Sequence, residues 1–240
     1  GKAIKGVVQI IQHERWLAAL GNNWWAANKA LDAMSPVFES TGEMPESSVI
    51  VDRLAKAFKS GKGSRIHAAG SIGGSFDKAA ATRLFHSEYL VAPAVHAPLE
   101  TRSATAQFAD GRLTLWIATQ APEACRRAAA SAIGISANAV TLIPMLAGGS
   151  FGRNLDSEIA GQVAYLAQKS GRPVQLVWSR PEEFVRDFVR APVQAKLTGA
   201  VDPAGMVKGL SIRVAVPATA REQAERLDGA LPHEALAAAK

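Results

Sequence analysis

The sequence is poor in cysteine, since Cys125 is the only one among 240 residues. A single cysteine excludes an internal disulfide framework, and it also excludes a cysteine-rich zinc or iron–sulfur site made by this chain alone. Cys125 lies in a predicted helix over residues 122–133, where a small buried thiol is the expected state. The thiol content therefore gives no information about the redox compartment.

Long apolar runs are also missing, because no window reaches the roughly 18 consecutive apolar residues that a membrane helix needs. The first residues, Gly1-Lys2-Ala3-Ile4, have neither the apolar region nor the cleavage site of a signal peptide. No initiator methionine is present, and a strand is predicted within a few residues of the start. We therefore expect an excised fragment whose upstream targeting information is lost.

Basic residues outnumber acidic ones, but they form no cluster. The composition is 48% hydrophobic and 20% charged, which is typical of globular proteins, and the formal net charge is +6. Arg126-Arg127 is the only adjacent basic pair, and no stretch combines basic with aromatic residues as nucleic-acid sites do. We predict no nucleic-acid binding. The positive charge suits solubility, an acidic partner surface or an anionic cofactor.

Several catalytic signatures are absent. A phosphate-binding Gly-Lys-Ser/Thr sequence and a GxGxxG sequence do not occur, which disfavours ordinary nucleotide folds. A serine-hydrolase triad has no support either. The histidines fit no metal-ligand spacing, and no protein-liganded metal is expected. They are His13, His67, His86, His96 and His233.

The predicted elements indicate an α+β fold with mixed sheets rather than strict β-α-β alternation. Strands are predicted at 4–11, 17–20, 84–91, 104–108, 113–119, 140–146, 173–178, 194–200 and 206–216. Helices are predicted at 24–34, 49–59, 122–133 and 156–170. Asp110-Gly111 is a typical hairpin turn, and Gly134 and Gly171 are expected to end the helices that precede them. The alanine-rich tail after Pro217 is compatible with one more helix.

The chain divides into three predicted segments. Residues 1–38 form a small β-β-α-β unit whose last strand ends near Phe38, with Asn22 or Asn23 capping its helix. Residues 39–83 are polar and glycine-rich, as expected for a linker, and contain one helix. Residues 84–240 hold most of the strands and form the main domain.

A glycine-rich loop over residues 147–153 follows a predicted strand and precedes a helix. Its sequence is Ala-Gly-Gly-Ser-Phe-Gly-Arg. Small residues allow backbone N–H groups to approach a ligand closely, and a helix N-terminus favours anions. Such a turn is equally often a purely structural feature. The similar string at 72–78 has no apolar strand before it, and we interpret it as coincidence.

Two further motifs lie upstream. Gln120, in the sequence Thr-Gln-Ala-Pro at 119–122, ends a strand and offers a neutral amide that can hold an oxo or hydroxyl ligand. A loop glutamine or helix cap is the simpler alternative for this residue considered alone. At 96–100, His-Ala-Pro-Leu-Glu places a histidine and a carboxylate four residues apart in a loop.

These three motifs, taken in order, resemble the molybdenum-pterin-binding subunit of the xanthine dehydrogenase and aldehyde oxidase family, and particularly its isoquinoline 1-oxidoreductase branch. The corresponding family patterns are HAPMEP, TQ followed by a helix, and LGGGFGRR. Residues 23–31 are similar to the end of the family's hammerhead domain, and residues 177–183 (VWSRPEE) are similar to the stretch after its loop helix. The resemblance implies that a hammerhead-like α/β end precedes part of a molybdenum-cofactor-binding domain.

The resemblance also implies roles for individual residues. In this family the glutamine hydrogen-bonds an oxo ligand on molybdenum, which implies that catalytic role for Gln120. The glycine–phenylalanine loop presents backbone amides to the cofactor, which implies a cofactor-binding role for the residues of the loop. These are Gly148, Gly149, Ser150, Phe151, Gly152 and Arg153.

Two departures from the family pattern bear on the loop. Ser150 stands where a third glycine is usual, and Asn154 stands where a second arginine is common. A positive φ at Ser150 would strain the loop by about 1 kcal/mol or more. The family's glutamate base lies in a later domain, and nothing in residues 219–240 resembles its surroundings. We therefore expect this chain alone to bind no cofactor and to be inactive.

The implied function is oxidation of an N-heterocycle or an aldehyde, with water as the oxygen source. The cofactor would be molybdenum-molybdopterin, as the cytosine dinucleotide, and electrons would pass to an iron–sulfur small subunit. The location would be the cytoplasm or the periplasm of a bacterium. The alternatives are a non-catalytic module that binds a phosphate-bearing ligand with the glycine loop, and a scaffold without a ligand. Analysis of metal and pterin in the complete protein separates these hypotheses.

Overall fold

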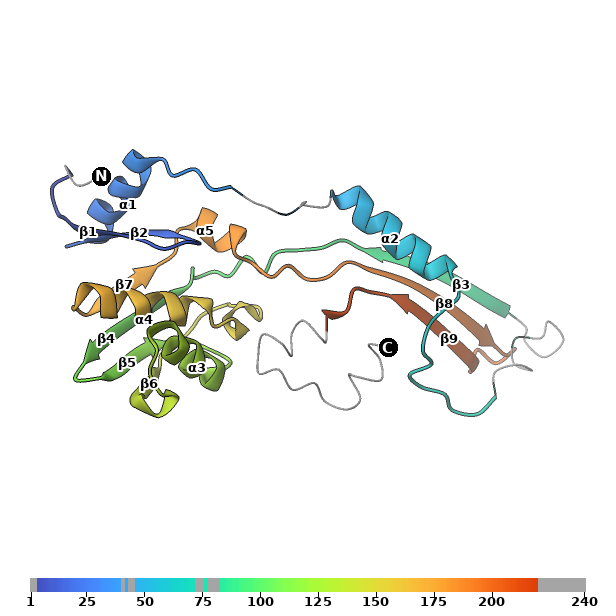
Figure 1. The fold of residues 1–240 in the computed structure, drawn as a ribbon. Helices are drawn as coiled ribbons and strands as arrows, with labels where there is room; N and C mark the ends of the chain where they lie inside the picture. The colour runs from blue at the N-terminus through green and yellow to red at the C-terminus, as the bar shows by residue number, and fades with distance from the viewer. Residues whose placement is uncertain (1–3, 40–41, 43–45, 72–75, 77–82, 220–240) are drawn as a thin grey trace. The chain divides into compact units, whose positions relative to one another are not determined.

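The computed structural model describes residues 4–39, 42, 46–71, 76 and 83–219. The chain forms two compact units, and each is built from two separate stretches of sequence. The first unit is Gly1–Glu43 with Pro98–Glu183, and the second is Met44–Ala97 with Phe184–Lys240. Helices and mixed sheets confirm the predicted α+β class (Figure 1). The described residues contain no helix that is long and apolar enough to cross a membrane.

The first unit begins with an antiparallel hairpin and a helix. Strands β1 (Val7–Gln12) and β2 (Leu17–Gly21) pair, and α1 (Trp24–Met34) follows. The side chain of Asn23 accepts a hydrogen bond of 2.9 Å from the N–H of Ala26, which confirms a predicted helix cap. The strand expected near Phe38 is wrong. That stretch is coil, because Pro36 offers no N–H to a sheet and residues 35–39 are unpaired with any strand of the described chain.

A four-stranded mixed sheet is the centre of the first unit, with strand order β6-β5-β4-β7. The strands are β4 (Ser103–Ala109), β5 (Arg112–Ile117), β6 (Val140–Pro144) and β7 (Val174–Val177). The β5 and β6 strands are parallel and the other pairs are antiparallel. Asp110 and Gly111, with φ of 50° and 73°, form the predicted hairpin turn.

Helices α3 (Pro122–Ile133) and α4 (Glu158–Ser170) pack together and contact this sheet (Figure 1). On β5 the alternation is clear, since Leu113, Leu115 and Ile117 are fully buried and the residues between them are more exposed. The core therefore lies between the helices and one face of the sheet. Strand β6 leads directly into the glycine-rich loop, and a 3₁₀ turn (η3, Arg153–Leu155) connects that loop to α4.

Aromatic contacts join the N-terminal hairpin to the rest of the first unit. The rings of His13 and Trp16 stack with centroids 4.6 Å apart, and both meet the Tyr165 ring of α4 edge-on, at 5.3 and 5.5 Å. Residues 1–43 are thus grouped with residues 98–183 rather than standing apart. As boundaries of the family's domains, residues 38 and 83 stay a prediction.

The second unit is a three-stranded antiparallel sheet with one helix. Its strand order is β3 (Arg83–Val91), β8 (Val193–Val201) and β9 (Val207–Ala215). The α2 helix (Ser47–Lys59) lies along one face, where the Arg213 guanidinium is 5.9 Å from the centre of the Phe58 ring (Figure 1). The short α5 helix (Arg180–Val185) was not predicted, because six residues are too few for a periodicity signal.

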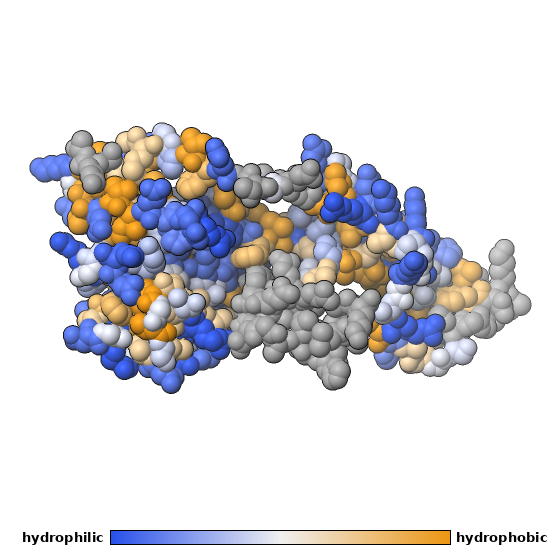
Figure 2. Space-filling model, in the orientation of Figure 1, coloured by the Kyte–Doolittle hydropathy of each residue, from blue (hydrophilic) through white to orange (hydrophobic). Residues whose placement is uncertain are grey.

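Apolar side chains cover the other face of this sheet. Ile212 pairs across the strands with Leu197, which in turn pairs with Ser87, so alternate residues on either side of these positions share a face. Four apolar residues of that face are about half exposed, and Figure 2 shows hydrophobic surface around these strands. They are Phe85, Tyr89, Leu210 and Val214.

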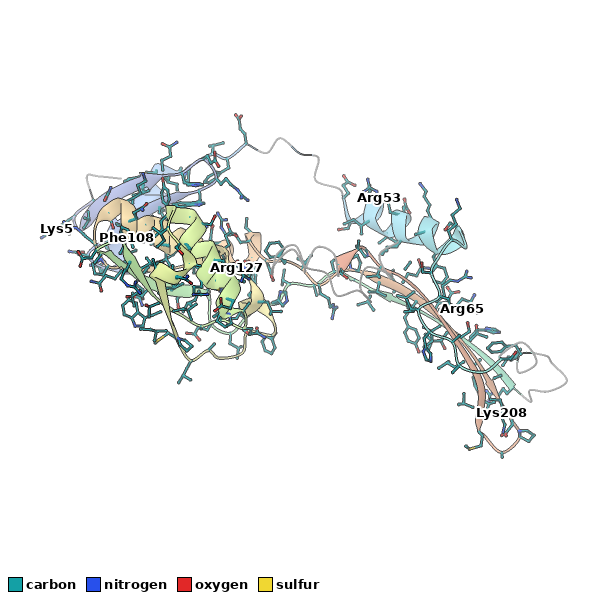
Figure 3. All side chains as sticks on the ribbon, turned by 60° about the horizontal axis from the view of Figure 1, so that its bottom comes forward. Lys5, Arg53, Arg65, Phe108, Arg127 and Lys208 are labelled. Carbon is teal, nitrogen blue, oxygen red and sulfur yellow. The ribbon has the colours of Figure 1, made fainter. Side chains whose placement is uncertain are left out.

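Several segments of each unit carry basic side chains. In Figure 3 Arg53, Arg65 and Lys208 come from three different segments of the second unit, and Lys5 and Arg127 come from two segments of the first. The expectation that the chain binds no nucleic acid stays a prediction. The possible tail helix and most of the 72–78 string lie outside the described residues.

Candidate functional site

The glycine-rich loop has an unusual backbone. Gly149, Phe151 and Gly152 adopt positive φ angles of 55°, 53° and 99°. Ser150 is not among the residues with positive φ, so the strain considered for this position falls on its neighbour Phe151 instead. A non-glycine residue in this region costs roughly 1–3 kcal/mol. The side chain of Phe151 is also 67% exposed, which is unfavourable for a phenyl ring in water.

The backbone N–H groups of this loop are available to a ligand. Four consecutive N–H groups, those of residues 149–152, donate no hydrogen bond to any part of the chain that the structure describes. A Cβ atom on Gly149 would lie 2.6 Å from the Leu99 Cδ1 atom, so the loop backbone and residue 99 approach closely. Successive N–H groups around left-handed residues form a concave anion-binding surface.

Gln120 lies directly against this loop. Its backbone N–H donates a hydrogen bond of 2.9 Å to the carbonyl of Asn154, just beyond the loop. The Ser150 hydroxyl donates a hydrogen bond of 3.2 Å to the Gln120 Oε1 atom. The structure therefore brings the predicted glutamine and the predicted glycine loop together, although 26 residues lie between Gln120 and residue 147 in the sequence.

The third motif, at residues 96–100, also forms hydrogen bonds with the loop. The Leu99 N–H donates to the Gly149 carbonyl at 3.0 Å, and a Glu100 carboxylate oxygen accepts from the Gly148 N–H at 3.3 Å. The Arg180 guanidinium donates to the carbonyls of Pro98 and Leu99 at 2.6 and 3.1 Å. These bonds tie the motif at residues 98–100 to the loop and to the later VWSRPEE stretch.

His96, at the start of the same motif, belongs to the second unit and is bound there. Its Nδ1 atom lies 2.7 Å from the Asp187 carboxylate, and its backbone N–H donates to the other oxygen of that carboxylate at 2.6 Å. The Asp187 side chain is fully buried. Within the described ranges, no three side chains that could hold a metal ion lie together, at His96 or elsewhere.

Arg153, at the end of the loop, points into the protein interior. Its side chain is 1% exposed and forms ion pairs of 2.7 Å with Glu183 and 2.8 Å with Asp156. Its guanidinium also lies 5.5 Å from the centre of the Trp178 ring. The predicted loop arginine is thus occupied by buried carboxylates, and its geometry suits support of the loop.

A second buried arginine completes this support. Arg102 donates to the carbonyls of Arg153 and Asp156, each at 2.8 Å, and its backbone N–H donates to Glu183 at 2.6 Å. Burial lowers the pKa of the Arg102 guanidinium, while the charge of Asp156 acts in the opposite direction. Sequence reasoning missed Arg102, Asp156 and Glu183. The only signal was the VWSRPEE similarity, which includes Glu183.

A cavity of about 160 Å³ opens beside the loop within the first unit. Its walls come from the start of the loop, from the Glu100 region and from the face of the sheet that the helices leave uncovered. Lining residues that bear polar or aromatic groups include Glu100, Thr105, Trp116, Asn154 and Gln175. The site thus combines backbone N–H groups that have no partner in the described chain, the carboxamide of Gln120 and an adjoining cavity.

The molybdopterin cofactor-binding domain model matches residues 58–231, which is more than half of the chain. The chain belongs to this family. The matched range includes all three motifs of the site, at residues 96–100, 119–122 and 147–153.

Known proteins of this group share sequence with the chain. The beta subunit of isoquinoline 1-oxidoreductase from Brevundimonas diminuta is 33% identical over 106 residues, covering 44% of this chain and 14% of that protein. The large chain of carbon monoxide dehydrogenase from Hydrogenophaga pseudoflava is 29% identical over 225 residues, covering 87% of this chain and 27% of that protein. The chain therefore matches less than a third of the length of these curated relatives.

Solved structures share its fold. Quinoline 2-oxidoreductase from Pseudomonas putida 86 superposes with a TM-score of 0.63 at 20% identity, covering 89% of this chain and 32% of that chain. The aldehyde oxidoreductase from Desulfovibrio desulfuricans ATCC 27774 gives a TM-score of 0.66 at 13% identity, covering 90% and 28%. These similarities show that the chain has the fold of a part of these proteins.

The residues of the site fit such a cofactor. Molybdopterin is anionic, and the four free N–H groups of residues 149–152 offer donors without a competing carboxylate on the same atoms. Glycine suits position 149, because its φ is 55° and a Cβ there would lie 2.6 Å from the Leu99 Cδ1 atom. The carboxamide of Gln120 adds a neutral polar group at the same place.

Proposed function

We propose that the complete protein is a molybdenum hydroxylase, an oxidoreductase that oxidises an N-heterocycle or an aldehyde with water as the oxygen source. The observation that carries this proposal is the row of backbone N–H groups at residues 149–152, with the Gln120 side chain hydrogen-bonded to Ser150 of the same loop. The chain that carries them belongs to the molybdopterin cofactor-binding family. The cofactor, when bound, supplies the redox chemistry. The protein residues bind and orient it.

Each site residue has a role in this proposal. The N–H groups of Gly149, Ser150, Phe151 and Gly152 bind the cofactor, and Gly148 is held in place by Glu100. The carboxamide of Gln120 would offer the cofactor a neutral hydrogen-bonding group beside the loop. Arg153 acts behind the loop, because its guanidinium neutralises the buried Glu183 and Asp156 carboxylates. The glutamate base comes from a part of the protein outside this chain.

The substrate class rests on the relatives' names. Isoquinoline, nicotinate and quinoline, which occur in those names, are N-heterocycles, and other matching proteins are named for aldehydes. We propose the cytosine dinucleotide form of molybdopterin as the cofactor and an iron–sulfur small subunit as the electron acceptor. The family resemblance of the three motifs supports both proposals.

The glycine loop offers a direct test in the complete protein. Gly152→Val should lower molybdenum and pterin content several-fold, because a β-branched residue resists a φ of 99° and adds bulk beside the N–H groups of the loop. Content is measured by metal analysis and by fluorescence of the oxidised pterin.

Gly171→Ala is the matched control. Gly171 also has a positive φ, of 63°, but it ends α4 and a Cβ there meets nothing within 4 Å. This variant should keep its cofactor while losing about 1 kcal/mol of stability. Normal molybdenum and pterin content in Gly152→Val would show that the loop is only a structural turn.

A further inference from the structure

We infer that Ser150 is a positioning residue that holds the Gln120 carboxamide in place beside the glycine-rich loop. This inference rests on the proposed function. It also gives a role to the residue at which the loop departs from the common three-glycine pattern. The observation is the hydrogen bond of 3.2 Å from the Ser150 hydroxyl to the Gln120 Oε1 atom.

The two ends of a carboxamide differ chemically. The Oε1 atom only accepts hydrogen bonds, whereas the Nε2 group only donates them. In the structure the Ser150 hydroxyl donates to Oε1, so the carboxamide is held beside the loop and its Nε2 group remains available to an acceptor. A serine hydroxyl could also accept from Nε2, so it can hold the carboxamide by either end. Glycine at this position has no hydroxyl and leaves the side chain without this restraint.

The main chain around Gln120 is already fixed by other bonds. The Gln120 N–H donates to the Asn154 carbonyl at 2.9 Å, and the Thr119 hydroxyl donates to the same carbonyl at 3.2 Å. The Ala121 N–H donates to the Thr119 hydroxyl oxygen at 3.0 Å. The remaining freedom of Gln120 is therefore in its side chain, which is long and loses conformational entropy when it is held.

The loop presents Ser150 without strain at the residue itself. Its neighbours Gly149 and Phe151 have the left-handed φ angles, and Ser150 does not. Its hydroxyl makes no other hydrogen bond within the described part of the chain. A threonine could retain the same bond, whereas alanine and glycine could not.

A double-mutant cycle in the complete holoenzyme tests this inference. We expect Ser150→Ala to lower kcat per molybdenum about two- to tenfold, the fold-change that corresponds to one ordinary hydrogen bond. In a Gln120→Ala background the same change should have no further effect, because the serine acts through the glutamine. Ser150→Thr should recover most of the kcat that Ser150→Ala loses, because it restores a hydroxyl. Molybdenum content should be unchanged in all of these variants.

A spectroscopic measurement separates positioning from a merely structural role. The Mo(V) electron paramagnetic resonance spectrum of the reduced enzyme should shift in the same direction in Ser150→Ala and Gln120→Ala, and it should be unchanged in Ser150→Thr. Independent, additive effects of Ser150→Ala and Gln120→Ala on kcat would overturn the inference and leave the proposed function standing. Loss of molybdenum in Ser150→Ala would also overturn the inference. A Gln120→Ala enzyme with normal kcat per molybdenum and a normal spectrum would overturn both.

Discussion

At the scale of single residues, the buried ion pairs behind the loop are the main supports of the site. Glu183 is fully buried, and its carboxylate accepts from the Arg153 guanidinium and from the backbone N–H of Arg102. Removing one partner of such a pair leaves an uncompensated buried charge, which costs more than the pair itself contributes.

Glu183→Ala should therefore lower the free energy of unfolding by about 3–5 kcal/mol, measured by urea denaturation. Glu123→Ala is the matched control, since the Glu123–Arg126 pair has the same 2.7 Å length but its carboxylate is 61% exposed. That change should cost less than about 1 kcal/mol. Equal effects of the two substitutions would show that the buried pair does not support the fold.

Cys125 gives a second prediction for a single residue. Burial raises the pKa of its thiol, although a side-chain hydrogen bond with Thr119 acts in the opposite direction. The thiol therefore stays protonated at neutral pH, and it is fully buried. We expect a thiol reagent at pH 7 to label Cys125 only at the rate at which the protein opens. Labelling as fast as that of a free thiol would contradict the buried position.

Residues that carry a sequence motif could be predicted, and residues that act through tertiary contacts could not. Gln120 and the loop lie in ordered motifs, and the structure places them together. Arg102 and Asp156 have no distinctive neighbours in the sequence, where a charged residue ordinarily indicates solvent exposure. Only folding shows that Arg102, Arg153 and Glu183 form one buried network.

At the scale of elements, local signals predicted most of the secondary structure. Helix α3 has the predicted limits, because Pro122 at its first turn and Gly134 after its end are strong signals. The hairpin at Asp110-Gly111 was predicted for a similar reason. The strand predicted near Phe38 does not form, because Pro36 offers no N–H to a sheet. Strand pairing across distant segments, such as β3 with β8, has no local signal.

Strand β5 provides a prediction at this scale, because its two faces differ. Leu115 faces the helices and is fully buried, whereas its neighbour Thr114 points to the other face and is partly exposed. Leu115→Ala should cost about 2–5 kcal/mol, and Thr114→Ala about 1 kcal/mol or less. Amide hydrogen exchange of β4 and β5 measures both effects. A larger loss of protection in Thr114→Ala would mean that the faces are assigned the wrong way round.

At the scale of the whole molecule, the chain corresponds to a part of much longer relatives. It covers 14% of the isoquinoline 1-oxidoreductase subunit and 27% of the carbon monoxide dehydrogenase large chain. The family resemblance implies that the cofactor is held between two such domains and that the base comes from another segment. We therefore predict that the isolated 240-residue chain contains no molybdenum and reduces no dye with any substrate. Substrate-dependent dye reduction by this chain alone would contradict that prediction.

The most direct test of the central claim is the molybdenum and pterin content of the complete protein, purified from a host that makes the cofactor. If the loop at residues 149–152 and Gln120 face molybdopterin, each protein chain should carry molybdenum and pterin in equal amounts. A phosphate-bearing ligand without molybdenum would instead support a binding module. A properly matured preparation that contains neither molybdenum nor pterin would contradict the account.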